Sequence, residues 1–213
     1  MVEKPGSLGR VSTSFTLRIA AGRTYCSGVL ISPDLDAALK TRTEFALTCA
    51  HFFLEKEAPL KVGGANFHVT VLGAVTIPLT DLAVVRLDRL SPPKDLPRVS
   101  TSRAPFLART LTRGFGGSYL SPQERHGRVV GYTPFGFSRN LATVVRSGAL
   151  IYNNPPAVRG DSGGPVIVDG EVVGVQSLIT DPFGKNLRIA TIQQVAPYHR
   201  QITSAVDALR DRY

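Results

Sequence analysis

Cysteine is scarce in this sequence, with only Cys26 and Cys49 among 213 residues. Two thiols could close one disulfide bond, but they cannot by themselves build the disulfide framework of a small secreted domain or a metal site. Long hydrophobic runs are missing as well: no apolar stretch reaches the length of about 18 residues that a membrane-spanning helix needs. Low-complexity tracts are also absent, which excludes a disordered or collagen-like chain.

The first ten residues lack the charged, apolar and small-residue regions of a secretory signal. This predicts a cytoplasmic protein if the sequence is full length, and a secreted or periplasmic one if it is a trimmed piece. The compartment therefore stays open. The sequence also gives no prediction of the oligomeric state.

Apolar residues make up 43% of the chain and charged residues 19%, which is typical of a globular protein. The net charge is +9. The arginines are dispersed from Arg10 to Arg212 without a basic tract, so nucleic acid is an unlikely partner. The charge instead favours acidic substrates or surroundings.

Short runs rich in Val, Ile, Leu, Phe and Thr alternate with turn residues, which indicates an all-β sandwich or barrel. Asp169-Gly170 predicts a two-residue hairpin turn, and residues 198–212 predict an amphipathic helix. A segment with four prolines, 91–105, predicts a linker between two β halves. The predicted strands are 15–20, 27–31, 45–48, 67–75, 82–87, 110–115, 128–132, 142–146, 165–168, 171–178 and 187–192.

One motif, Gly160-Asp161-Ser162-Gly163-Gly164, has two interpretations. It fits the nucleophile elbow of an α/β hydrolase, but that elbow needs a helix after the serine, and here Pro165 opens a hairpin. The other interpretation is a nucleophilic serine on a glycine-rich turn. A serine hydroxyl attacks a carbonyl only when a base takes its proton and N–H groups receive the oxyanion.

Four histidines are candidate bases: His51, His68, His126 and His199. His51 ends an apolar strand, a position that holds a side chain rigidly at a cleft edge, whereas His68 and His126 stand in surface patterns. For a single histidine a structural role is the commoner interpretation. Asp81 directly precedes a strand that should be buried. A carboxylate there needs a partner, unless it is simply a turn residue.

Together these segments resemble the His, Asp and Ser blocks of chymotrypsin-like serine proteases, in that family's order. The segments are Thr48-Cys49-Ala50-His51, Asp81-Leu82-Ala83-Val84-Val85 and Gly160-Asp161-Ser162-Gly163-Gly164-Pro165-Val166. Supporting marks are Cys26 to Ser32, Gly114-Phe115-Gly116, Ser177-Leu178-Ile179 and the terminal helix. The scarcity of disulfides suits a bacterial or viral type of member.

The resemblance implies two six-stranded antiparallel β barrels and a C-terminal helix, all-β in class. Residues 1–95 would form the N-terminal barrel, 96–197 the linker and C-terminal barrel, and 198–213 the helix. It implies an endopeptidase acting on protein or peptide substrates, with Ser162 as nucleophile, His51 as base and Asp81 as its orienting acid. Gly160 and Ser162 N–H would hold the oxyanion, and no metal or cofactor is expected. Competing functions are a non-catalytic module that binds an acidic partner, and an esterase or acyl transferase.

Specificity departs from the trypsin pattern. Pro156 occupies the position that is acidic in trypsin-like members, so cleavage after Arg or Lys is not expected. Ile179 suggests a shallow pocket for small or medium apolar side chains, although Arg188 could instead receive an acidic one. The predicted substrate-binding residues are Pro156, Ala157, Arg159, Ser177, Ile179 and Arg188.

Two further features stay open at this stage. Many family members pair the Asp before the nucleophile, here Asp161, with an amine freed by proteolysis, and no standard activation site is present. Removal of Met1 could expose Val2 for that role; otherwise Asp161 needs a side-chain or backbone partner. Cys26 and Cys49 could form a disulfide or remain two buried thiols.

Overall fold

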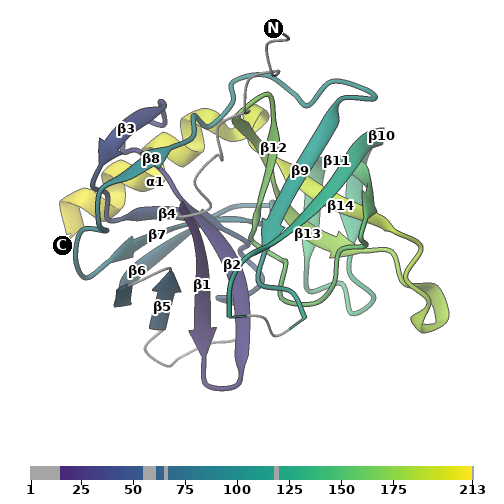
Figure 1. Cartoon of the computed structure of the whole chain (residues 1–213), viewed down its shortest axis with the longest axis horizontal. Helices are drawn as coiled ribbons and strands as arrows, with labels where there is room; N and C mark the ends of the chain where they lie inside the picture. Colours follow the sequence, from purple (N-terminus) through teal and green to yellow (C-terminus); the bar gives the residue numbers. More distant parts are fainter. Residues whose placement is uncertain (1–14, 55–60, 65–66, 118–119, 213) are drawn as a thin grey trace, which may run out of the picture.

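The computed structural model describes residues 15–54, 61–64, 67–117 and 120–212. Its strands form two closed antiparallel barrels, which lie side by side in Figure 1. The first barrel has the order β1 (Thr16–Ala21), β2 (Thr24–Leu30), β4 (Phe45–Thr48), β7 (Leu82–Leu87), β6 (Phe67–Ile77), β5 (Lys61–Gly64). The second has the order β10 (Gln123–Phe137), β11 (Val144–Asn154), β14 (Ile189–Gln194), β13 (Glu171–Ile179), β12 (Pro165–Val168), β9 (Arg109–Gly114).

The hydrophobic pattern explains how the strands close. In β1, Leu17 and Ile19 are buried and Arg18 between them is half-buried, as expected for a strand with one face on a core. All four residues of β4, which pairs with both β2 and β7, are buried. The prediction of an all-β fold with two six-stranded barrels is therefore confirmed.

The terminal helix α1 (His199–Arg212) follows the second barrel but packs against β6 and β7 of the first. Its buried residues are Ile202, Ala205, Val206 and Leu209, the apolar face predicted from the sequence. Two short 3-10 turns, Pro182–Gly184 and Ala196–Tyr198, precede it. No helix of the described residues is long and apolar enough to span a membrane.

Three short strands were not predicted. β3 (Ala38–Thr41) and β8 (Lys94–Leu96) pair with each other outside the barrels, and β5 completes the first barrel. β8 lies inside the predicted linker, so that segment is not free of strands. How the chain divides into domains at residues 95 and 197 stays a prediction.

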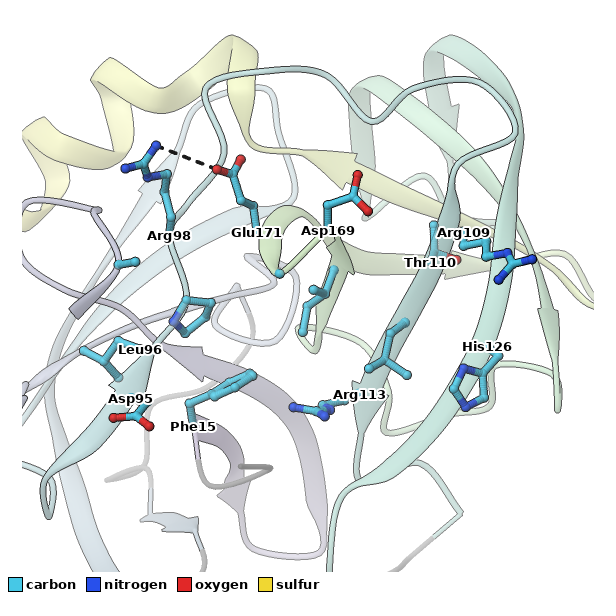
Figure 2. A pocket seen from close by; sticks show the side chains of 15 residues that line it. Phe15, Asp95, Leu96, Arg98, Arg109, Thr110, Arg113, His126, Asp169 and Glu171 are labelled. Carbon is cyan, nitrogen blue, oxygen red and sulfur yellow. Dashed lines mark ion pairs between the residues drawn. The ribbon is translucent and has the colours of Figure 1, made fainter. Parts of the chain in front are cut away.

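Between β12 and β13 the predicted hairpin turn is confirmed. Asp169 and Gly170 both have positive φ, 49° and 84°, as a type I′ turn requires. Ile167, just before this turn, packs in the same core as residues of the first barrel. A cavity opens beside β9, between Phe15 and this hairpin (Figure 2).

Candidate active site

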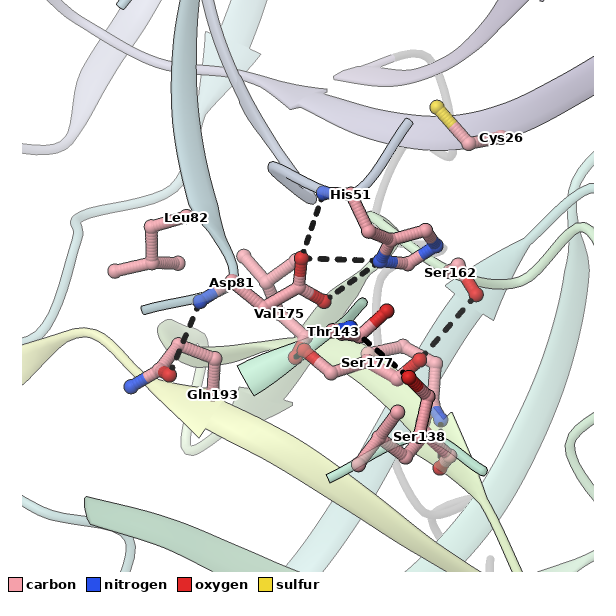
Figure 3. A network of polar contacts seen from close by, with 12 residues as sticks. Cys26, His51, Asp81, Leu82, Ser138, Thr143, Ser162, Val175, Ser177 and Gln193 are labelled. Carbon is pink, nitrogen blue, oxygen red and sulfur yellow. Dashed lines mark hydrogen bonds and ion pairs between the residues drawn. The ribbon is translucent and has the colours of Figure 1, made fainter. Parts of the chain in front are cut away.

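His51 lies just after β4, where the buried strand ends in a turn. Its backbone N–H donates to Asp81 Oδ1 at 2.9 Å, and its ring Nδ1 lies 3.0 Å from Oδ1 and 2.9 Å from Oδ2 of the same carboxylate. Figure 3 shows the ring between Asp81 and the side chain of Ser162. With Nδ1 bound to the carboxylate, Nε2 is the nitrogen left for Ser162.

Asp81 follows the turn that connects β6 to β7, and its side chain is only 1% exposed. The carboxylate would be costly there without a partner, and His51 supplies it. The Asp81 backbone N–H donates to Gln193 Oε1 at 3.3 Å, and Gln193 belongs to β14 of the second barrel. Asp81 is therefore both a turn residue and part of a contact between the barrels.

The protonation of His51 depends on three effects. Burial disfavours the imidazolium and lowers the pKa of His51, whereas Cys49 and Asp81 favour it, and the net pKa is raised above its ordinary value. Burial also raises the pKa of the Cys49 thiol well above its usual value, so this thiol is uncharged near neutral pH. Asp81 is then the group whose negative charge raises the pKa of His51.

Ser162 sits on a turn of the second barrel that glycines make tight. Gly160 and Gly163 have φ of +98° and +84°, a region that suits glycine. The Ser162 Oγ is half-buried and lies 3.5 Å from the carbonyl oxygen of Ser177, a long contact that leaves the hydroxyl weakly held. Within the described ranges, the N–H groups of Gly160 and Ser162 donate to no other protein atom.

Ser27 of β2 fastens this turn to the first barrel. Its backbone N–H donates to the Ser162 carbonyl oxygen at 2.7 Å, and its hydroxyl donates to the Gly160 carbonyl at 2.7 Å. The same hydroxyl accepts the Phe115 N–H at 2.9 Å. A Cβ on Gly163 would lie 2.0 Å from the Ser27 carbonyl oxygen, so the two segments are in contact through their backbones.

Asp161 is fully buried and finds a side-chain partner, Arg125 of β10. Arg125 Nε donates to Asp161 Oδ2 at 2.5 Å. Gly116 N–H donates to Oδ1 and Val158 N–H to Oδ2, each at 2.9 Å. Both oxygens are thus satisfied from within the second barrel. Val2, the alternative partner considered from the sequence, lies outside the described residues.

Residues 26–175 match the family model of the trypsin-like peptidase domain. The chain belongs to this family. The match contains both His51 and Ser162, and it confirms the resemblance drawn from the sequence. No curated protein matches the sequence of this trypsin-like peptidase.

Solved structures show the same fold as the peptidase. The active form of the Rv3671c protease from M. tuberculosis has a TM-score of 0.72 at 17% identity, covering 96% of this chain and 94% of that one. Kallikrein-related peptidase 10 has a TM-score of 0.70 at 18% identity, covering 95% and 100%. The serine endoprotease from Yersinia pestis has a TM-score of 0.66 at 20% identity, covering 96% and 68%.

The predicted pocket residues of the peptidase have different environments. Ala157 and Ser177 are buried, Pro156 and Ile179 are half-buried, and Arg159 is exposed. Their roles in binding stay a prediction. The side-chain amide of Asn186, in the loop between β13 and β14, donates a hydrogen bond to the Ala157 carbonyl oxygen at 2.6 Å.

Arg188 has an exposed side chain whose guanidinium donates to Asn154 Oδ1 at 2.7 Å. Its backbone N–H donates to Asn186 Oδ1 at 2.8 Å. The guanidinium is thus engaged with an amide at the surface. This weakens the case for Arg188 as the receiver of an acidic substrate side chain.

Two further sequence questions receive an answer. Cys26 and Cys49 are free and buried, and the Cys26 thiol lies 3.6 Å from Thr48 Oγ1. After Ser162 the chain enters strand β12 rather than a helix, which does not fit the nucleophile elbow of an α/β hydrolase.

Sequence reasoning missed Ser27, Arg125 and Gln193 as residues that position the peptidase site. Ser27 was visible only as part of the strand before the His block. Arg125 and Gln193 carry no local motif, since each acts on a residue more than thirty positions away. Arg125 precedes the predicted strand 128–132, so the sequence carried no signal that its side chain would be buried.

Proposed function

We propose that this trypsin-like peptidase is a serine endopeptidase that uses Ser162, His51 and Asp81. One observation carries the proposal: the His51 ring is held by both oxygens of a buried carboxylate on one side and faces Ser162 on the other. A neutral imidazole with Nδ1–H on Asp81 has its lone pair on Nε2, where it can accept the Ser162 proton.

The reaction would run in two halves. Ser162 Oγ bonds to the scissile carbonyl carbon while its proton moves to His51 Nε2. Collapse of the tetrahedral intermediate breaks the C–N bond, and the leaving amine takes that proton from His51. Water then attacks the acyl-enzyme with His51 again as base, which returns the hydroxyl of Ser162 and releases the new carboxylate.

The oxyanion would bind to the N–H groups of Gly160 and Ser162. Both donors are uncommitted in the described part of the chain, and the positive φ of Gly160 sets the direction of the turn. Preorganised donors of this kind stabilise the charge that develops in the transition state. The Ser27 contacts support this role because they hold the carbonyl groups of the same two residues.

For specificity we propose cleavage after small or medium apolar residues. Pro156 offers no charge to a basic side chain, and the branched side chain of the half-buried Ile179 would narrow the pocket entrance. Arg188 already binds Asn154, which disfavours the acidic alternative.

Labelling with a fluorophosphonate probe tests the nucleophile. We expect the wild-type protein to be labelled and Ser162→Ala not to be, with Ser102→Ala, an exposed serine, as the matched control that keeps full labelling. If the labelled protein cleaves esters but no peptide of a library, the function is that of an esterase and not of an endopeptidase. Absence of labelling in the folded wild type would contradict a catalytic function.

The same library tests the pocket. Ile179→Gly removes the branched side chain at the entrance, so we expect cleavage after Phe to gain roughly 10- to 200-fold relative to cleavage after Ala. The ratio is obtained from kcat/KM on two peptides that differ only at this residue. An unchanged ratio would mean that Ile179 does not line the pocket.

A further inference from the structure

The cavity beside β9, of about 640 Å³, lies between the two barrels, and no residue of the proposed triad, oxyanion site or substrate pocket lines it. One wall comes from Phe15, just before β1, and from Leu96 of β8. The facing wall comes from β9 and from the β12–β13 hairpin (Figure 2). The volume is in the range that holds small organic ligands in proteins.

The inner surface of this cavity is apolar. Phe15, Leu96 and Ile167 are buried, and Leu111 is half-buried beside them. A ligand body without polar groups would therefore replace water there at a gain in free energy.

Arg98, Arg109, Thr110 and His126 also line the cavity, but the charged side chain that is buried in its wall is that of Arg113. Its side chain is only 3% exposed, and Nε and one terminal nitrogen both donate to Glu124 Oε1, at 3.1 and 2.8 Å. The other terminal nitrogen, NH1, is buried and has no hydrogen-bond acceptor among the described residues. The guanidinium lies 5.2 Å from the centre of the Phe15 ring and is directed across the cavity in Figure 2.

A buried guanidinium N–H without an acceptor is costly, and a charged oxygen is a stronger acceptor for it than a neutral one. Three acids at the rim outnumber the two exposed arginines there, Arg98 and Arg109, and this limits how much negative charge the ligand can carry. Asp95 accepts the Lys40 N–H at 2.9 Å, Glu171 lies 3.8 Å from Arg98, and Asp169 is exposed at the hairpin turn. A second negative group on the ligand would meet these carboxylates.

We propose that this cavity binds a small amphipathic monoanion, a carboxylate with an apolar chain. The carboxylate accepts a hydrogen bond from Arg113 NH1, and the chain lies against Phe15, Leu111 and Ile167. Because Glu124 holds the other nitrogens of Arg113, the free donor has a fixed direction, which favours a planar acceptor such as a carboxylate.

Calorimetric titration with decanoate tests the proposal on the whole chain. We expect saturable binding of decanoate with a Kd below about 1 mM. Decan-1-ol should bind at least tenfold more weakly, and Ser162→Ala should bind decanoate with unchanged affinity. No saturable heat, equal affinity for the alcohol, or loss of binding in Ser162→Ala would overturn it, the last because it would place decanoate in the catalytic cleft.

Two variants locate the site. Arg113→Met keeps an apolar stem and should weaken decanoate at least tenfold, and Leu111→Trp should fill the cavity and weaken both decanoate and the alcohol. Arg128→Met, an exposed arginine on the neighbouring strand β10, is the matched control and should bind as the wild type does. Wild-type affinity in folded Arg113→Met or in folded Leu111→Trp would contradict the assignment, and the alcohol comparison holds even if one variant fails to fold.

Discussion

The contact between His51 and Asp81 predicts how activity depends on pH. Burial lowers the pKa of His51, but Cys49 and Asp81 raise it, and the net pKa lies above the ordinary value of about 6.5. Only the neutral imidazole can accept the Ser162 proton, so kcat/KM should rise with pH through a midpoint above about 6.5. A pH profile of kcat/KM on a peptide substrate measures this midpoint.

Asp81→Asn provides the comparison for that profile. Without the carboxylate the imidazolium loses its stabilising charge, so the midpoint should move to lower pH while the limiting rate falls by several orders of magnitude. A midpoint that stays where it was would show that Asp81 does not control the protonation of His51.

Arg125 and Asp161 form a buried ion pair, with side chains 7% and 0% exposed. Arg125→Met leaves a buried carboxylate without its cation, so we expect the free energy of unfolding to fall by about 3 to 5 kcal/mol and labelling of Ser162 to drop. Urea unfolding and fluorophosphonate labelling measure the two effects. Arg128→Met, on the same strand but exposed, should change neither. Wild-type stability in Arg125→Met would contradict the role of the pair.

At the scale of elements, two glycines with the same φ of +84° separate strain from contact. A Cβ added to Gly163 would lie 2.0 Å from the Ser27 carbonyl oxygen, whereas a Cβ added to Gly170 would have no atom within 4 Å. Gly163→Ala should therefore cost about 3 kcal/mol or more and abolish labelling. Gly170→Ala should cost only about 1 to 2 kcal/mol of backbone strain. Equal losses in urea unfolding would rule out the contact between the barrels as the cause.

The sequence predicted those elements that carry a strong periodic pattern. Strands made of a nearly continuous apolar run, such as β7, were found to the residue, and the helix face around Ile202 was found through its spacing. β5 was missed because Lys61–Gly64 contains two glycines and no alternation. β3 and β8 were missed because their residues are partly exposed and pair only with each other.

At the scale of the whole molecule, the family blocks predicted which residues would meet, but not what holds them together. His51, Asp81 and Ser162 each stand in a motif that can be read locally. Ser27 and Arg125 act through contacts that exist only after the strands close into barrels. Sequence spacing does not determine such contacts, so the supporting residues of a site are the ones it misses.

The net charge of +9 leads to a prediction for substrates. Acidic peptides should be attracted to the surface, and salt should screen this attraction as the Debye length falls from about 30 Å at 0.01 M to about 8 Å at 0.15 M. We expect kcat/KM for a peptide with acidic flanks to fall severalfold over that range. A neutral peptide with the same scissile bond is the control, and an equal fall for both would exclude steering.

The Arg125 to Asp161 pair also bears on when the enzyme becomes competent. In a protease whose carboxylate beside the nucleophile pairs with an amine freed by proteolysis, that cleavage sets the time of activation. Here the cation is Arg125 of β10, which pairs with Asp161 once the second barrel has folded. The Ser162 turn would therefore reach its final form as this barrel folds. For the proposed peptidase, the final shape of the Ser162 turn would then need no freed amine, and control of its activity would fall to inhibitors, to its location or to the supply of unfolded substrate.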